Sequence, residues 1–230
     1  MEFLDFDTDL FGGPFGLFQV TDTVSLAPEE FESFIELYIA YFNRAPDSGG
    51  LYFWGSAFAN GFSLEEIASF FIGQPETEAA YPPGTSNEVF AETVYNNVLG
   101  RASDPGGLKF WVDALDAEAV SRDQFILQVL RGAKVDLPPG TDPDLIDQQL
   151  EDRAYLEDKV DIGAYFAVHK GMTDVDNAAA AMTLFGDQDA ADIPGAVAAI
   201  DDFHAQALDP DTGEFLMPLV GVLDDPFAAA

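Results

Sequence analysis

Two segments of this chain place an arginine and a tryptophan at the same spacing. Residues 44–54 read RAPDSGGLYFW and residues 101–111 read RASDPGGLKFW, so eight of eleven positions are identical at an offset of 57. We call them the first and the second motif copy. A guanidinium beside aromatic rings can bind a sugar or an anion, but it can also fix the turn by bonding to the aspartate of its own motif or to the carbonyls that end the preceding helix. Arg44 and Arg101 therefore have a functional and a structural interpretation.

The aromatic residues of the motif are the candidate ligand-binding residues. Trp54 and Trp111 are the only two tryptophans of the chain. Tyr52 broadens the aromatic surface of the first copy, and Lys109 takes its place in the second. A tryptophan at helical spacing is more often a core residue than a platform for sugars. The functional interpretation predicts a ligand surface formed by these four residues, and the structural one predicts that the tryptophans belong to the core.

The remaining residues contain no arrangement typical of a catalytic site. His169 and His204 are the only imidazoles, and they lie on different predicted helices outside any HExxH pattern. The sequence contains no nucleophile elbow for a Ser–His–Asp triad and no glycine-rich phosphate loop. We therefore expect that the protein is not an enzyme.

A calcium site is the one metal site that the sequence suggests. Residues 209–214 read DPDTGE, and Asp209, Asp211 and Gly213 resemble the start of a calcium loop. An EF-hand would require Gly at position 214 and Glu at position 220, which are Glu214 and Val220 here. A capped turn is the simpler interpretation, with calcium as the only cofactor left open.

Helices must position both motif copies. Apolar residues recur at helical spacing over residues 28–43, with Pro28 suited to the first turn. Asp47 and Asp104 then stand where an N-cap is expected for a second helix, and Pro105 follows the latter as a favoured first helical residue.

Glycines and capping boxes complete the repeated unit. Gly50 and Gly107 allow close approach of the backbone within each motif copy. A third helix begins at Ser63 with Glu66, and its counterpart begins at Ser121 with Gln124, which are two capping boxes. The unit is therefore helix, tight turn, helix, loop and helix, about 57 residues long.

The sequence PPGT occurs at residues 82–85 and again at 138–141 and separates the units. Thr85 and Glu88 form a third predicted capping box. We expect a first helical repeat at 25–80, a second at 81–137 and a C-terminal helical region at 144–230.

The C-terminal region has a different pattern. One or two helices run to Gly171, a helix capped by Thr173 or Asp176 ends at Gly186, and another spans residues 193–208. The apolar tail, which begins GEFLMPLVG, is either a packed strap or a segment for a partner. No convincing alternating pattern of strands occurs, so the predicted class is all-α.

The N-terminal residues 1–24 form a separate segment in which apolar and acidic residues are interleaved. Its glycines and proline disfavour a helix. The segment is either an arm that packs on its own domain or one that inserts into a partner protein. The phenylalanines that would bind that partner are Phe3, Phe6, Phe11, Phe15 and Phe18.

The charge restricts the classes of partner. Nine Lys and Arg stand against 42 Asp and Glu, which gives a net charge of −33. Such a field repels nucleic acids and anionic membranes. The acidity has three interpretations: a solvated surface in a salty or calcium-rich medium, binding of divalent cations, or binding of a partner with a basic surface.

There is no cysteine, no apolar run of about 18 residues for a membrane, and no basic start of a signal peptide.

The repeated unit resembles the bacterial domain of unknown function 4214. The resemblance covers residues 30–135 and rests on Tyr38 with NRAPD at 43–47 and FW at 53–54, and on Tyr95 with LGRASD at 99–104 and FW at 110–111. Similar domains occur in type I-secreted and surface-layer proteins, where a related region holds the layer to lipopolysaccharide. Similar short proteins resemble head spikes of phage-like gene transfer agents, which bind capsule. The chain lacks the GGxGxD calcium repeats of the secreted members.

The resemblance implies a non-catalytic extracellular protein on a bacterial surface or a phage-like particle. Its helical units would bind envelope polysaccharide, either capsule or lipopolysaccharide, and its N-terminal arm would attach it to a larger protein assembly. The alternative is a purely structural component of a surface layer or particle, without a glycan ligand.

Overall fold

The computed structural model describes residues 26–228, and every regular element among them is helical, which confirms the predicted all-α class. The first half contains α1 (Pro28–Phe42), α2 (Ser48–Ala59), α3 (Leu64–Phe71), α4 (Pro75–Ala80), α5 (Asn87–Leu99), α6 (Pro105–Asp116) and α7 (Arg122–Lys134). The second half contains α8 (Pro143–Ala164), the π-helix η3 (Tyr165–His169), α9 (Val175–Phe185), the 3-10 helix η4 (Gln188–Ala190) and α10 (Ile193–Ala207). The predicted arm at residues 1–24 lies outside the described residues.

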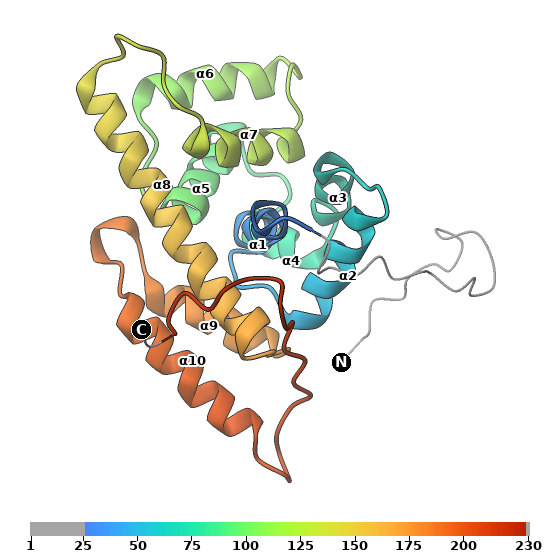
Figure 1. Cartoon of the computed structure of the whole chain (residues 1–230). Helices are drawn as coiled ribbons and strands as arrows, with labels where there is room; N and C mark the ends of the chain where they lie inside the picture. The colour runs from blue at the N-terminus through green and yellow to red at the C-terminus, as the bar shows by residue number, and fades with distance from the viewer. Residues whose placement is uncertain (1–25, 229–230) are drawn as a thin grey trace, which may run out of the picture.

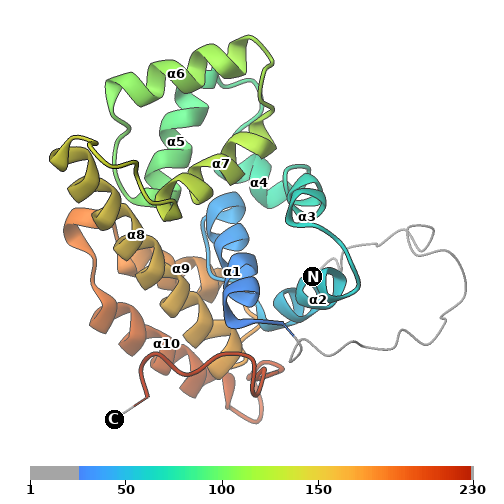
Figure 2. The ribbon, with the colours of Figure 1, turned by 45° about the horizontal axis from the view of Figure 1, so that its top comes forward.

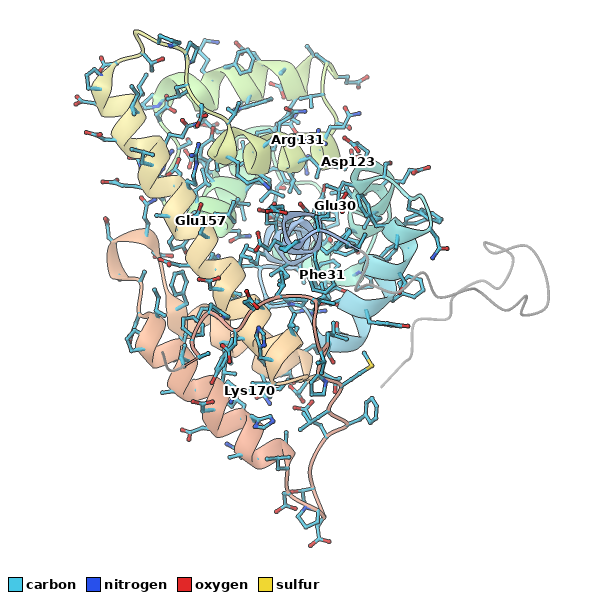
Figure 3. The ribbon with its side chains drawn as sticks, in the orientation of Figure 1. Glu30, Phe31, Asp123, Arg131, Glu157 and Lys170 are labelled. Atoms are coloured by element: carbon cyan, nitrogen blue, oxygen red, sulfur yellow. The ribbon has the colours of Figure 1, made fainter. Side chains whose placement is uncertain are left out.

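Helices α1 and α8 form the middle layer of the molecule. The bundle of α5, α6 and α7 lies at one end and the pair α9 and α10 at the other (Figures 1 and 2). Helix α1 contacts α2, α4, α5, α7 and α8, and Phe31 on it lies near the centre of the molecule with no exposed surface (Figure 3). Because α8 also contacts α5 and α7, the C-terminal region packs directly on both predicted repeats.

Helices α1, α2 and α3 have counterparts in α5, α6 and α7, about 57 residues later in the chain. Helix α2 begins at Ser48 and α6 at Pro105, an offset of 57, and the capping boxes at Ser63 and Ser121 begin the helices that follow. The short helix α4 was not predicted. Its six residues are too few to display a helical period, although Pro75 occupies its first turn.

Two predicted caps are wrong by one or two residues. Ser86, not Thr85, caps α5, because its hydroxyl accepts a hydrogen bond from the Val89 N–H. Asp174, not Thr173 or Asp176, caps α9. Neighbouring Ser, Thr and Asp residues have similar capping ability, so the local sequence does not distinguish them.

The tail is a packed strap as far as residue 228. The Met217 N–H donates to the Gly171 carbonyl at 2.7 Å, and the Leu219 N–H donates to the Val168 carbonyl at 2.9 Å. Leu219 and Val222 are buried. The strap therefore covers η3 and the turn that follows it.

A buried lysine joins α8 to the end of α5. Lys159 is 3% exposed, and its ammonium donates at 2.7 Å to the carbonyl of Asn97 in the last turn of α5. This carbonyl has no partner within the helix, so the contact satisfies it. Burial lowers the pKa of Lys159 from 10.5 to about 8, although the charge of Asp187 raises it.

We expect Lys159→Met to stabilise the protein by about 1–2 kcal/mol at pH 7, because removal of the buried charge outweighs loss of the hydrogen bond to the Asn97 carbonyl. Between pH 8 and 10.5 the unfolded wild-type chain binds more protons than the folded chain, so its stability rises with pH there. The advantage of the variant should therefore shrink across that interval. Urea unfolding at pH 7 and pH 10.5 checks this, and an equal difference at both pH values would contradict it.

Candidate functional site

Each motif arginine binds a carboxylate that another element supplies. Arg44 Nε and Nη2 lie 2.5 and 3.1 Å from the two carboxylate oxygens of Glu76 on α4. Arg101 Nε and Nη2 lie 2.5 and 2.6 Å from those of Asp152 on α8. Each Nη1 also donates at 2.9 Å to the carbonyl of the next residue. Both guanidiniums are therefore held by two bonds to one carboxylate, which is the strong form of this contact.

The motif aspartates and glycines form the turn itself. Asp47 Oδ1 accepts from the Gly50 N–H at 2.8 Å, and Asp104 Oδ1 accepts from the Gly107 N–H at 2.7 Å. A Cβ atom at Gly50 would lie 2.1 Å from the hydroxyl oxygen of Tyr38. Arg44 Nη1 lies 3.5 Å from Asp47, so the predicted contact within the motif is secondary to the one with Glu76.

The first motif copy is closed by its neighbours. Arg44 is 4% exposed, and Ser48 is fully buried. The Ser48 N–H donates to the Met172 carbonyl at 2.9 Å, and its hydroxyl donates to the Gly171 carbonyl at 3.1 Å. Trp54 stacks on Phe70 with ring centroids 5.8 Å apart. The turn after η3 therefore covers the motif, and Trp54 packs against the core, as does Tyr52.

The second motif copy instead borders a cavity of about 730 Å³, which we call the motif cavity. Its wall combines the end of α5, the motif turn, α6, α7, the first half of α8, and η4. The residues that line it are Tyr95, Leu99, Arg101, Ala102, Ser103, Asp104, Trp111, Gln128, Val129, Gly132, Ala133, Leu137, Asp144, Leu145, Gln148, Gln149, Glu151, Asp152, Gln188 and Asp189.

A network of amides surrounds the Arg101 pair in this cavity. Gln148 and Gln188 each donate to Asp152 Oδ1 at 3.2 Å, so this oxygen accepts from three side chains. The hydrogen bond with Asp152 raises the pKa of Arg101, and burial raises the pKa of Tyr95. Arg101 is therefore a fixed cation that positions Asp152. Gln148 and Gln188, which bond to Asp152, also line the cavity.

Of the predicted ligand-binding residues, Trp111 is the one that lines the motif cavity. Its ring meets that of Phe125 edge to face at 5.1 Å, so Trp111 packs against the core as Trp54 does, and both residues stay partly exposed. Lys109 lies outside the lining, largely exposed, and pairs with Asp113 at 2.7 Å. The predicted surface of four residues is therefore divided between α2, which carries Tyr52 and Trp54, and α6, which carries Lys109 and Trp111.

An acidic cavity of about 400 Å³ lies between α1, α7 and α8. Glu32, Glu36 and Asp161 line it, and Lys134 pairs with Glu36 at 2.7 Å. Burial, followed by neighbouring carboxylates, raises the pKa values of Glu32 and Asp161. Within residues 26–228, no group of three or more His, Asp or Glu is arranged to hold a metal ion.

The predicted calcium loop is a turn closed by its own backbone. Asp209 Oδ1 accepts from the N–H groups of Asp211 and Thr212 at 2.8 and 2.9 Å, and these bonds lower the pKa of Asp209.

The two histidines lie on separate elements, His169 at the end of η3 and His204 in the last turn of α10. Nothing in the structure explains the buried Nε2 of His169, which has no hydrogen-bond partner among the described residues.

No helix of the described part of the chain combines the length and the apolar character needed to cross a membrane.

Comparison with known proteins finds a family similarity in part of the chain. Residues 68–133 match the model of a family described as Domain of unknown function (DUF4214). The match begins within α3 and ends within α7, and it includes the second motif copy and the parts of α5, α6 and α7 that line the motif cavity. No curated protein and no solved structure matches the chain.

Proposed function

We propose that this protein binds a bacterial envelope polysaccharide, capsule or lipopolysaccharide, in the motif cavity and without catalysis. The observation that carries the proposal is the contrast between the two motif copies. The same turn is closed in the first copy by Ser48 and the residues after η3, whereas the second borders a cavity. The cavity beside the second copy therefore offers a ligand the space that the first copy lacks.

The aromatic lining suits the apolar faces of sugar rings. Trp111 and Tyr95 border the motif cavity, and both rings belong to amphipathic side chains with a polar handle. The volume of about 730 Å³ lies within the range typical of ligand sites. A short segment of a glycan chain is a ligand of suitable size.

The polar lining suits hydroxyl groups. The amide of Gln128 has no hydrogen-bond partner among the described residues, and it can both donate and accept. Asp144 and Glu151 add carboxylate oxygens that accept hydrogen bonds. Because Arg101 and Asp152 hold each other, the amides beside them are positioned before a ligand arrives, which reduces the entropic cost of binding.

The setting of this function is part of the proposal. The acidic composition fits an extracellular protein on a bacterial surface or a phage-like particle. The apolar sequence of residues 1–24 suits attachment to a larger protein assembly. Deletion of these residues should abolish that attachment and leave glycan binding intact.

The proposal predicts different effects for the two tryptophans. Trp111→Ala should weaken binding of the purified chain to capsular polysaccharide or lipopolysaccharide at least tenfold, because it removes the cavity's largest aromatic surface. Trp54→Ala is the matched control, since Trp54 holds the same motif position but packs on Phe70. Calorimetric titration with and without calcium measures both, and thermal unfolding verifies that each variant is folded.

Two results would overturn the proposal. Equal loss of affinity in both variants would place the ligand outside the motif cavity. Absence of binding to capsule and to lipopolysaccharide, with and without calcium, would favour the purely structural role.

A further inference from the structure

The motif cavity offers hydrogen-bond acceptors in excess and lacks a free cation. Five of its lining residues are carboxylates, namely Asp104, Asp144, Glu151, Asp152 and Asp189. Among residues 26–228 its only lining cation is Arg101, whose guanidinium is already engaged by Asp152 and by the Ala102 carbonyl. An acidic group of a ligand would therefore meet negative charge without a cation to pair with it.

Three of these carboxylates remain available to a ligand. Asp104 caps α6 and Asp152 accepts from Arg101 and two glutamines. The side chains of Asp144, Glu151 and Asp189 have no hydrogen-bond partner among the described residues. Ionised carboxylates only accept hydrogen bonds, so the ligand must supply the donors. Sugar hydroxyls and ammonium groups are donors, whereas uronate and phosphate groups are not.

The glutamine amides that line the cavity offer a ligand few hydrogen-bond donors. Gln149 donates to the carbonyls of Gly132 and Val135 at 2.7 and 2.6 Å, and Gln148 and Gln188 are engaged with Asp152. Gln128 is the lining glutamine whose amide makes no hydrogen bond within the described part of the chain. The cavity therefore offers a ligand one free amide as a hydrogen-bond donor and three free carboxylates as acceptors.

We propose that the motif cavity selects glycan segments without acidic groups, that is, neutral sugars or amino sugars, and rejects uronate and phosphate. This inference rests on the proposed function and names the ligand class of the same site. For lipopolysaccharide it directs binding to uncharged repeating units rather than to phosphorylated parts. For capsule it directs binding to polymers whose acidic groups are absent or distant from the bound segment.

Chemical reduction of one polymer provides the matched test. An acidic capsular polysaccharide is compared with its carboxyl-reduced form, in which each uronate has become a neutral hexose in the same chain. We expect the reduced polymer to bind at least tenfold more tightly in 0.15 M salt. At that ionic strength the Debye length is about 8 Å, so distant surface charge is screened while charge within the cavity still acts.

A charge variant separates the cavity from the protein's overall charge. Neutralising the three free carboxylates with Asp144→Asn, Glu151→Gln and Asp189→Asn should reduce the preference for the reduced polymer to less than threefold. The control carries Asp211→Asn, Asp202→Asn and Asp224→Asn, the same change in net charge at residues outside the cavity lining. It should retain the full preference.

The outcomes distinguish this inference from the proposed function. Tighter binding of the native acidic polymer would overturn the inference while binding in the cavity stands. A preference that the control reduces as much as the cavity variant would also overturn it, because the selection would then come from overall charge. Failure of both polymers, and of lipopolysaccharide, to bind would overturn the inference and the proposed function together.

Discussion

Replacement of Arg101 by Met should lower the free energy of unfolding by about 3–5 kcal/mol, because it leaves a buried carboxylate without its cation. The side chain of Asp152 is 7% exposed and accepts two hydrogen bonds from Arg101. Met retains much of the volume of the arginine stem, so the decrease in the free energy of unfolding measures mainly the charge pair. Urea unfolding measures it.

A second substitution tests the cause. Asp152→Asn removes the stranded charge, so the double variant should be more stable than Arg101→Met alone, a coupling that a double-mutant cycle quantifies. Arg44→Met should cost less, about 1–2 kcal/mol, because the side chain of its partner Glu76 is 46% exposed and returns to water. Equal losses at Arg44 and Arg101, with no rescue by Asp152→Asn, would contradict the role of buried charge.

Replacement of Gly171 by Ala should detach the C-terminal strap and lower stability by about 3 kcal/mol or more. Gly171 has φ +66°, and a Cβ atom there would lie 2.3 Å from the backbone nitrogen of Pro218. Its carbonyl also accepts from Met217 and Ser48, so the strap and the first motif copy meet at this residue. The cost combines left-handed backbone strain with a collision that neither backbone can avoid.

Gly84→Ala is the control for the strain alone. Gly84 has φ +84°, but no atom lies within 4 Å of the position that an alanine methyl group would take there, so we expect a loss of about 1 kcal/mol. Limited proteolysis should cut residues 209–228 faster in Gly171→Ala than in Gly84→Ala. Equal losses of stability and equal cleavage would show that the strap does not depend on this contact.

The amino-acid sequence by itself determined the helices and their starts. Asp47, Asp104 and Ser63 cap the predicted helices with their side chains, and Ser121 stands at the cap position of α7, because a cap depends on a backbone group only three residues away. The all-α class and the period of 57 follow from such local signals. The family match over residues 68–133 agrees with the resemblance for the second motif copy, and the first copy at 44–54 lies outside it.

The residues of the motif cavity were only partly predictable. Arg101, Asp104 and Trp111 stand out because the motif is written twice. Asp152, Gln148 and Gln128 have no such signal, since they lie at ordinary positions on α7 and α8. The second PPGT at 138–141 marks the start of α8 but not the face of α8 that packs on α5 and α7.

Only the tertiary structure decided how the two motif copies differ. Arg44 and Arg101 stand in motif copies that share eight of eleven residues, yet one binds Glu76, 32 residues away on α4, and the other binds Asp152, 51 residues away on α8. The residues after η3 then close the first copy, whereas the second borders a cavity. Caps depend on neighbours along the chain, but partners and open space depend on how distant helices pack, and that packing is set by the whole buried core at once.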